Sequence, residues 1–535
     1  MPAPPTSLIP RPVAFWSGVA LTFAGVAEHL WMYIDSAHMD FDMSSMGMTP
    51  LMWEAMVAIV VGVLISGFAL IQPTAAADRP APPPAQLTTG GRRRLVAILS
   101  FALMVDQMKP ATLAFVSPGM REEFHLSASE VAWLPTVALT GTVIGSLVWG
   151  RAADRIGRRA TILISSLLFL GTTVCGAMPT FSGNLIMCAL MGMAAGGMLP
   201  VVYALMTESL PPGRRAAIMV LQAGLTTTGG YMAASGLAAL LLPVAGWRLL
   251  WFAQLPLVLV LIALNRWIPE SAAFTAGAVK PEPVPASALF QRPQRAKTLV
   301  ISGYALAWGL IYWGFITFLP SLLEDSSGEG GMSAATLLFI SSLLSIPACA
   351  VAAWMYTRWS AKGTMVVYGA LTVTALLALA AIGTHGSRPL LLTAVMVLFA
   401  GTAGVIALLG PYTAEVYPTA IRGTAGGWAA AVGKSGGAFG PPLIAVLLSA
   451  PGGMRTAALL VALPMALAAI AVAVRGSSPQ TKPGPLSDHS PLEAELDALL
   501  ESEPAPVTER FAAPDHGPRT PSAATLPASP TRSQS

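Results

Sequence analysis

The chain has 535 residues, of which 54% are hydrophobic and only 10% are charged, and its formal net charge is +4. A soluble globular domain carries about 25% charged residues, so this composition excludes a protein whose whole surface faces water. Apolar residues come in long blocks of about 20, the length that crosses a bilayer as a helix. Because an open strand leaves unpaired backbone groups in lipid, we expect an all-α membrane protein.

Fourteen spans are expected along the chain, two in an N-terminal extension and twelve in two groups of six. A linker rich in Pro and Gly follows the extension, and a long loop divides the two groups. The expected boundaries are 1–75 for the extension, with spans near 12–34 and 50–72, 76–93 for the linker, 94–270 and 298–475 for the two groups, 271–297 for the loop and 476–535 for a tail. The Pro-, Ser- and Ala-rich composition of this tail predicts disorder.

Lys and Arg gather in alternate loops. The basic loops carry Arg92, Arg93, Arg94, Arg151, Arg155, Arg158, Arg159, Arg214, Arg215, Arg292, Arg295, Lys297, Arg358, Lys362 and Arg422, whereas the other loops carry only Arg121, Arg248, Arg388 and Arg455. Cytoplasmic loops hold the excess of Lys and Arg in membrane proteins. We therefore expect a multi-pass protein of the cell membrane, inner or plasma, with both termini in the cytoplasm.

The two groups of six spans share a loop pattern. After the fourth span of each group, Pro stands three residues after a Glu and Arg stands seven after it. The two copies are Glu208, Pro211 and Arg215, and Glu415, Pro418 and Arg422. Such a repeat predicts two bundles related by an axis along the membrane normal, with a cavity between them near the midplane.

One basic loop, from Gly150 to Arg159, reads Gly-Arg-Ala-Ala-Asp-Arg-Ile-Gly-Arg-Arg. It resembles the signature of the major facilitator superfamily, G-x-x-x-D-R-x-G-R-[RK], and matches it fully. The resemblance implies a twelve-helix fold of two six-helix bundles that moves a solute by alternating access, here with two extra helices in front. The alternative is a loop that only fixes the topology.

The same loop suits a gate. Gly150 and Gly157 permit a tight turn, and Asp154 can accept hydrogen bonds from cationic neighbours, which would latch the bundles together. The second half keeps Arg358 in the matching loop but lacks the Asp and the Gly. The candidate gate residues are Gly150, Asp154, Arg155, Gly157, Arg158, Arg159, Glu208, Arg215, Arg358, Glu415 and Arg422.

Further motifs resemble the branch of metabolite–proton symporters that contains aromatic-acid and sugar transporters. They are Gly246-Trp247-Arg248, Pro269-Glu270-Ser271 and the run from Glu415 to Gly423. The resemblance covers nearly all of residues 94–475. The chain departs from the branch at Cys188, where members often carry an arginine implicated in proton handling.

Two ionisable residues fall inside the first core span, where each costs roughly 2.5–3.5 kcal/mol on insertion scales. Asp106 and Lys109 stand three residues apart, on one face of a helix. The resemblance implies a role for Asp106 in proton coupling. Lys109 is expected either to bind a substrate carboxylate or to pair with Asp106, and the alternative is a purely structural ion pair.

Other candidate substrate or coupling residues lie in later spans. Trp308 and Tyr312 share a helix face, with Trp313 beside them, and their rings suit a solute of mixed polarity; the alternative is anchoring at the membrane interface. Gln222 is equally suited to bind a substrate or another helix. Lys434 stands where the branch has an arginine, and it is expected to assist the substrate or a gate.

The extension carries a loop rich in Met, His and carboxylates. Thioethers and imidazoles together suit copper, and His29, His38, Met39 and Met43 are weak candidate ligands. No ligand spacing fixes a geometry, so the alternative is an outer loop with incidental Met and His, and no metal site is assigned.

Together these features predict a secondary transporter that moves a small organic solute, such as an organic or aromatic acid or a sugar-like compound, with protons. An efflux carrier for a drug or toxic metabolite is the alternative, and copper handling by the extension is a second one. The sequence shows no nucleotide-binding loop and no catalytic constellation, so we expect neither an enzyme nor a cofactor. The expected partners are the solute, protons and the lipid bilayer, with no nucleic acid, and we expect a monomer.

Overall fold

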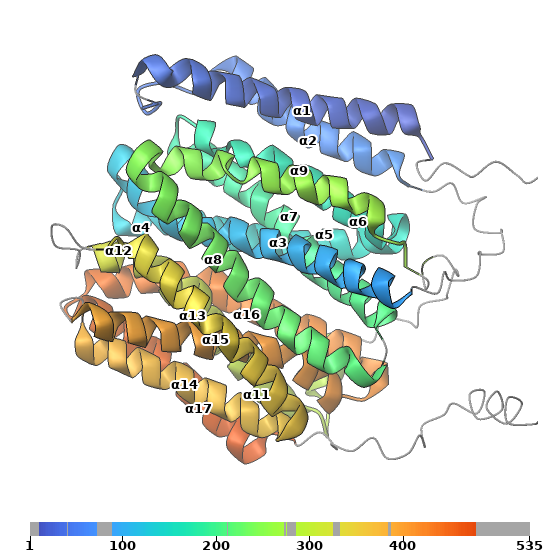
Figure 1. Cartoon of the computed structure of the whole chain (residues 1–535), viewed down its shortest axis with the longest axis vertical. Helices are drawn as coiled ribbons and strands as arrows, with labels where there is room; N and C mark the ends of the chain where they lie inside the picture. The colour runs from blue at the N-terminus through green and yellow to red at the C-terminus, as the bar shows by residue number, and fades with distance from the viewer. Residues whose placement is uncertain are drawn as a thin grey trace, which may run out of the picture. The chain divides into compact units, whose positions relative to one another are not determined.

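The structure, a computed structural model, describes residues 10–39, 41–71, 88–210, 212–271, 274, 285–324, 332–383 and 387–477. Most of the predicted linker lies outside these residues, as do part of the predicted loop between the two groups and nearly all of the tail. Within them, every regular element is a helix (Figure 1).

The extension and the first group contain α1 (Pro12–Asp35), η1 (Ser36–Met39), α2 (Pro50–Ala69), α3 (Thr89–Glu123), α4 (Ala128–Val131), α5 (Trp133–Ile156), α6 (Arg158–Gly171), η3 (Thr172–Ala177), α7 (Phe181–Ser209), α8 (Pro212–Phe252), α9 (Leu255–Leu264) and η4 (Asn265–Trp267). The second group contains η5 (Ala286–Phe290), α11 (Arg295–Gly309), η6 (Leu310–Phe315), η7 (Ile316–Phe318), α12 (Leu319–Glu324), α13 (Ala334–Arg358), α14 (Ala361–Ile382), α15 (Arg388–Val416), α16 (Thr419–Ser449) and α17 (Gly453–Arg475).

Thirteen helical segments among the described residues are long and apolar enough to cross a membrane. One of them, Ala217–Trp267, has 51 residues, which at 1.5 Å per residue would extend about 75 Å, more than twice the ~30 Å hydrocarbon core. The chain changes direction inside it at Gly246, whose φ is 69°, a value that glycine adopts without steric cost. The segment therefore makes two passes, and the all-α membrane fold is confirmed.

Helix α3 starts earlier than the sequence predicts. The Thr88 hydroxyl accepts a hydrogen bond from the Gly91 amide at 3.1 Å, and this N-cap fixes the first residue of the helix at Thr89. Arg92 and Arg93 therefore belong to α3, together with Arg94, and not to the linker that we bounded at 76–93. The predicted boundary was set at the start of the apolar block, which is too late because the polar residues before that block are also helical.

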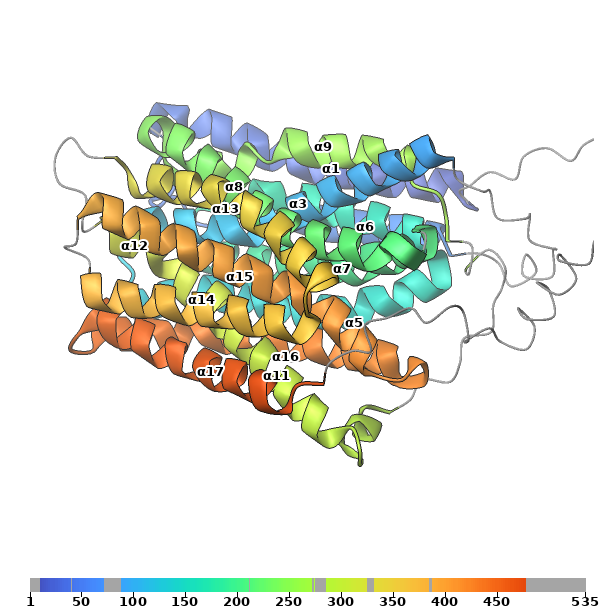
Figure 2. The same cartoon turned by 60° about the horizontal axis from the view of Figure 1, so that its bottom comes forward.

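Two bundles make up the core, α3–α9 and α11–α17, and they pack along α8 with α13 and along α5 with α16 (Figures 1 and 2). The extension lies on the first bundle, where α1 contacts η3 and α2 contacts α6. Helices α1 and α2 approach so closely that a Cβ on Gly18 would lie 2.5 Å from the Gly62 carbonyl oxygen. Only glycine fits at this crossing.

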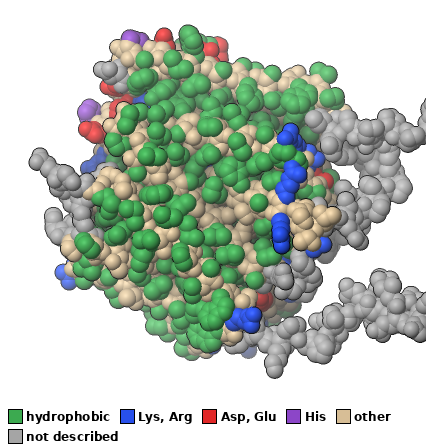
Figure 3. Space-filling model, viewed as in Figure 1, with side chains coloured by type: hydrophobic (Ala, Val, Ile, Leu, Met, Phe, Trp, Pro, Cys, Tyr) green, Lys and Arg blue, Asp and Glu red, His purple; other side chains and the backbone are tan. Residues whose placement is uncertain are grey.

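Apolar side chains cover much of the face shown in Figure 3, and Lys and Arg gather at one end of it. We call this the basic end; it holds the start of α3, the end of α5, the start of α6 and the start of α16. Leu240 is 70% exposed and Val474 is 73% exposed. Apolar residues so exposed over a continuous surface are expected where lipid, not water, covers a protein.

Candidate functional site

A cavity of 380 Å³ lies between the two bundles. Helices α3, α5, α7 and α8 line it on one side, and α11, η6, α15 and α16 line it on the other. Of the seven predicted coupling or substrate residues, Asp106, Trp308, Trp313 and Lys434 line this cavity. The cavity also reaches Arg422 in the first turn of α16, so it extends toward the basic end.

Asp106 is a buried carboxyl at the wall of this cavity, with an exposed fraction of 2%. Its Oδ2 accepts a hydrogen bond from Gln107 Nε2 at 3.1 Å. Its Oδ1 is buried and has no hydrogen-bond partner among the described residues. A buried charge without sufficient partners is costly, so this oxygen is suited to take up a proton.

Lys109 does not pair with Asp106. Its Nζ donates to the Phe169 carbonyl oxygen at 2.7 Å and to Thr172 Oγ1 at 2.9 Å, and it lies 5.1 Å from the centre of the Phe169 ring. These groups stand where α6 gives way to η3, and the end of a helix carries partial negative charge. Lys109 is therefore held inside the first bundle, and the structure does not bring it to the cavity.

Lys434 reaches across the two bundles. Its Nζ donates to Ser146 Oγ at 2.5 Å, which joins α16 of the second bundle to α5 of the first. Asp106 of the first bundle lines the same cavity as Lys434. One cation and one carboxyl thus face the same cavity from opposite bundles.

The aromatic residues of the seventh core span lie in the interior. Trp308 and Tyr312 stack with ring centres 5.1 Å apart, and Trp313 meets Tyr312 edge to face at 4.8 Å. The Trp308 indole donates to the Thr402 carbonyl oxygen at 3.1 Å. Trp308 and Tyr312 are both buried, so they do not anchor the protein at a membrane interface.

Tyr203, which was not among the predicted residues, also lines the cavity. It belongs to α7, three residues after Pro200. Its one signal in the sequence is a polar hydroxyl within an apolar span. Gln222 and Tyr312, which we predicted, do not line the cavity; both polar atoms of the buried Gln222 amide lack partners among the described residues.

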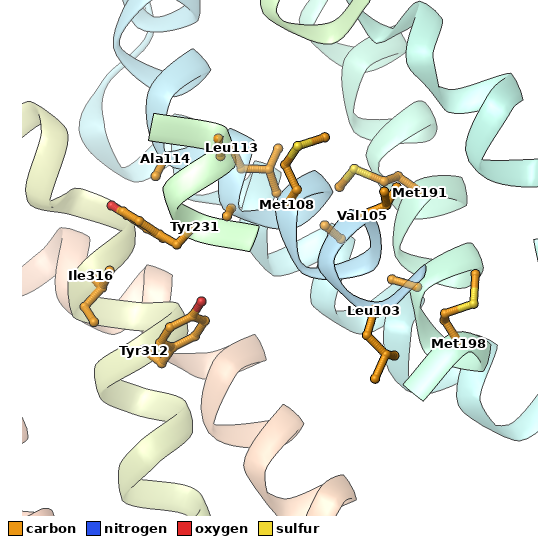
Figure 4. Close-up of a cluster of buried hydrophobic side chains, with 14 of the residues drawn as sticks. Leu103, Val105, Met108, Leu113, Ala114, Met191, Met198, Tyr231, Tyr312 and Ile316 are labelled. Atoms are coloured by element: carbon orange, nitrogen blue, oxygen red, sulfur yellow. The ribbon is translucent and has the colours of Figure 1, made fainter. Parts of the chain in front are cut away.

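Four aromatic side chains, Phe115, Tyr231, Tyr312 and Phe399, form what we call the aromatic plug. Tyr231 packs against Phe115 at 5.5 Å and against Phe399 at 4.7 Å, and Tyr312 donates to the Thr227 carbonyl oxygen at 3.4 Å. Figure 4 shows the two tyrosines on neighbouring helices of the two bundles. Phe115 of the plug lines a second pocket, and Thr227, to which Tyr312 donates, lines the cavity.

The second pocket, of 1110 Å³, lies at the end opposite the basic end. Beside it, Arg248 forms an ion pair with Glu123 at 2.5 Å, and the Trp247 indole donates to the same carboxylate at 2.8 Å. The Arg248 guanidinium also donates to the carbonyl oxygen of Gly176 at 2.7 Å. The Gly-Trp-Arg motif thus ties α8 to the end of α3.

The candidate gate residues around Gly157 contact one another within the first bundle. Gly157 has a φ of 95°, and a Cβ there would lie 2.4 Å from Glu270 Oε2. Glu270 Oε1 accepts from the Arg158 amide at 2.7 Å, and the Arg158 guanidinium pairs with Glu208 at 2.8 Å. Ser271 donates to the same Glu208 at 2.5 Å.

The other gate candidates are more scattered. Arg215 donates to the Leu210 carbonyl oxygen at 3.2 Å, and Arg155, Arg358 and Glu415 are exposed. A Cβ on Gly150 would meet nothing within 4 Å, so no close helix approach requires that glycine. The Arg159 amide donates to Glu270 at 3.3 Å, and the Asp154 side chain lies outside the described residues.

Comparison with known proteins supports the family on a large part of the chain. The model described as Major Facilitator Superfamily matches residues 97–441. The chain belongs to this superfamily. It is a membrane transporter of solutes and not an enzyme, as its relatives are transporters.

Three relatives of this transporter are named for what they carry. The putative niacin/nicotinamide transporter of Bacillus subtilis is 29% identical, over 66% of this chain and 88% of that protein. The cis,cis-muconate transport protein of Acinetobacter baylyi is 31% identical, over 65% and 86%. A 4-hydroxybenzoate transporter of the same organism is 26% identical, over 71% and 90%.

A solved structure shares the fold of this transporter. The D-xylose–proton symporter matches with a TM-score of 0.60 and 15% identity, over 73% of this chain and 99% of that chain. The twelve-helix core predicted from the sequence is therefore confirmed. The extension helices α1 and α2 precede the family match, which begins at residue 97.

The candidate copper ligands of the extension occupy separate environments. His29 is buried in α1, where its Nδ1 donates to the Gly25 carbonyl oxygen at 2.8 Å. His38 is exposed, Met39 is half-buried and Met43 is fully buried. The described part of the transporter contains no group of three or more His, Cys, Asp or Glu residues placed to hold a metal ion.

Proposed function

We propose that this transporter takes up a small aromatic or unsaturated carboxylate together with protons. The observation that carries the proposal is the cavity itself, which Asp106 lines from one bundle and Lys434 from the other, together with Trp308 and Trp313. The names of the relatives point to the same class, because they include niacin, cis,cis-muconate and 4-hydroxybenzoate.

The size and lining of the cavity suit such a solute. Small-molecule sites measure about 300–1,000 Å³, so a cavity of 380 Å³ suits a single ring better than a bulky solute. Trp308, Trp313 and Tyr203 offer faces and edges for a planar molecule. Lys434 and Arg422 are the cations of the lining, and either can donate charge-assisted hydrogen bonds to a carboxylate.

Proton coupling follows from the charges of the cavity. While Asp106 is ionised, its negative charge attracts Lys434 and repels an incoming carboxylate. When Asp106 takes up a proton, the charge of Lys434 becomes available to the substrate. A carboxylate and a proton then enter together and leave together, because release of the proton restores the attraction between Asp106 and Lys434.

Alternating access would carry the carboxylate and the proton together across the membrane. The excess of Lys and Arg supports a cytoplasmic basic end, with both termini inside a cell membrane and the transporter acting as a monomer. The cavity, which reaches Arg422, would then open toward the cytoplasm. The cluster of Arg158, Glu208 and Glu270 would form the cytoplasmic gate with its neighbours in the signature loop.

The test uses the full transporter in proteoliposomes with an inward proton gradient. Nicotinate and nicotinamide form a matched pair, since they differ only in a carboxylate and a neutral amide. We expect nicotinate, or 4-hydroxybenzoate in its place, to accumulate and an uncoupler to abolish the accumulation. Equal uptake of acid and amide, or release of protons on addition of bulky solutes, would contradict the proposal and favour an efflux carrier.

A further inference from the structure

The Lys434 ammonium has a single hydrogen-bond acceptor among the described residues, Ser146 Oγ at 2.5 Å. An ammonium group has three protons to donate. The titratable or charged side chains that line the cavity are Asp106, Tyr203, Arg422 and Lys434, and none of the other three accepts a hydrogen bond from Lys434. The cation is therefore held by a neutral hydroxyl and not by a carboxylate.

Ser146 is itself held firmly in the first bundle. Its hydroxyl proton points to the carbonyl oxygens of Thr142 at 2.8 Å and Gly196 at 2.9 Å, so a lone pair is left for Lys434. The neighbouring Gly145 packs so closely on α7 that a Cβ there would lie 2.1 Å from the Met193 carbonyl oxygen. The acceptor consequently stands at a fixed position behind the cavity wall.

We propose that Ser146 is the resting partner of Lys434, which holds the ammonium in the empty cavity until the substrate carboxylate takes its place. This inference rests on the proposed function. A neutral hydroxyl suits the task because a carboxylate, unlike a hydroxyl, also carries the charge opposite to that of the ammonium and therefore binds it more strongly. The substrate therefore displaces Ser146, whereas before the substrate arrives Lys434 is bonded to Ser146 and to no carboxylate of the described residues.

The Lys434–Ser146 bond also joins α16 to α5, so replacing it by a bond to the substrate changes how the two bundles are held together. While Lys434 is bound to Ser146, the two bundles are joined at this point. A substrate that captures Lys434 breaks this tie and leaves α16 free to move against α5. Ser146 thus acts as a positioning residue that sets both the affinity for the carboxylate and the moment at which the bundles separate.

Binding of nicotinate to the purified full-length transporter tests this at acidic pH, where Asp106 is protonated and does not compete. Ser146→Ala removes the resting partner, so we expect nicotinate to bind roughly two- to tenfold more tightly. Ser146→Asp offers a tethered carboxylate, so we expect binding at least roughly tenfold weaker. Ser165→Ala, which removes a buried hydroxyl of the first bundle that donates to the Ala194 carbonyl oxygen at 2.8 Å and lies outside the cavity lining, should leave affinity unchanged.

Lys434→Gln separates failure of this inference from failure of the proposed function. If Lys434→Gln loses nicotinate binding but Ser146→Ala binds like the unaltered transporter or more weakly, Lys434 holds the substrate and the resting-partner role is wrong. If nicotinate binds equally well to Lys434→Gln, both proposals fall. Should Ser146→Asp lower the melting temperature through misfolding, Ser146→Ala alone decides.

Discussion

Replacing Asp106 by Asn tests proton coupling while changing the shape of the site as little as possible. The Asn side chain oxygen can still accept the bond that Gln107 Nε2 donates at 3.1 Å, so the cavity should keep its form. What is lost is the group that binds the proton. We therefore expect Asp106→Asn to bind and exchange the carboxylate but not to accumulate it against a gradient.

The size of the effect follows from the stoichiometry of one proton for each carboxylate. Every pH unit across the membrane is worth about 1.4 kcal/mol, or a tenfold concentration ratio. The unaltered transporter should thus accumulate the substrate up to about tenfold for one pH unit. The Asp106→Asn variant should bring the carboxylate only to equal concentrations on both sides.

Labelled 4-hydroxybenzoate in proteoliposomes provides the assay, in two modes. Uptake under a proton gradient measures coupling, and counterflow without a gradient measures exchange. Liposomes without protein are an essential control, because a weak acid also crosses a bilayer in its neutral form and follows a pH gradient. Thr413→Ala serves as the matched variant, since it alters a cavity residue that does not titrate and whose hydroxyl donates to the Leu409 carbonyl oxygen and not to Asp106. Undiminished accumulation by Asp106→Asn would refute the assignment of Asp106.

Three further predictions concern other parts of the fold. Lys109→Met should lower the free energy of unfolding by about 1–3 kcal/mol but leave substrate affinity unchanged. Thermal unfolding and binding measurements check these two effects, and a selective loss of affinity would contradict a structural role. Gly62→Val should loosen the packing of α1 on α2, because a Cβ at residue 62 lies 2.5 Å from the Gly18 carbonyl oxygen. We expect faster proteolysis of the α1–α2 region and unchanged uptake, and a loss of uptake would show that transport needs the extension. Tyr312→Ala should open the aromatic plug. A water-soluble thiol reagent added at the end opposite the basic end should then react with a cysteine placed at Thr227, whereas this cysteine should stay protected when Tyr312 is present.

Hydropathy and one motif were enough to predict the fold, because the bilayer restricts the options so strongly. The length of the apolar blocks gave the spans, and the signature from Gly150 to Arg159 gave the superfamily. The boundary at the start of α3 was less accurate, since a polar helix end projects beyond the membrane. The turn at Gly246 also leaves only a weak trace in composition, although it divides two spans.

The cavity was predicted less completely, for a geometric reason. Asp106 and Lys109 are three residues apart, which places them about 60° apart around a helix with 3.6 residues per turn. On α3 this angle is enough to place Asp106 at the wall of the cavity and Lys109 in the interior of the first bundle. Spans that are apolar on all sides carry no stripe to show their rotation, so Tyr203 was not predicted. Gln222 and Tyr312 do not line the cavity, and their roles as substrate or coupling residues stay predictions.

The contacts of the signature loop were equally hidden from the sequence. The segment Gly150–Arg159 does not itself indicate that Glu270 caps α6, because Arg158 and Glu270 are 112 positions apart in the chain. The motif Pro269-Glu270-Ser271 was recognised as a family feature without a partner. Only the packing of the first bundle brings the two segments together.

The even number of passes in the extension matters for how the transporter is made. Helices α1 and α2 precede α3 and therefore leave the ribosome before it. Because two passes return the chain to the side from which it started, the twelve-helix core enters the bilayer in the same direction as it would alone, and the basic run Arg92–Arg94 reinforces that direction.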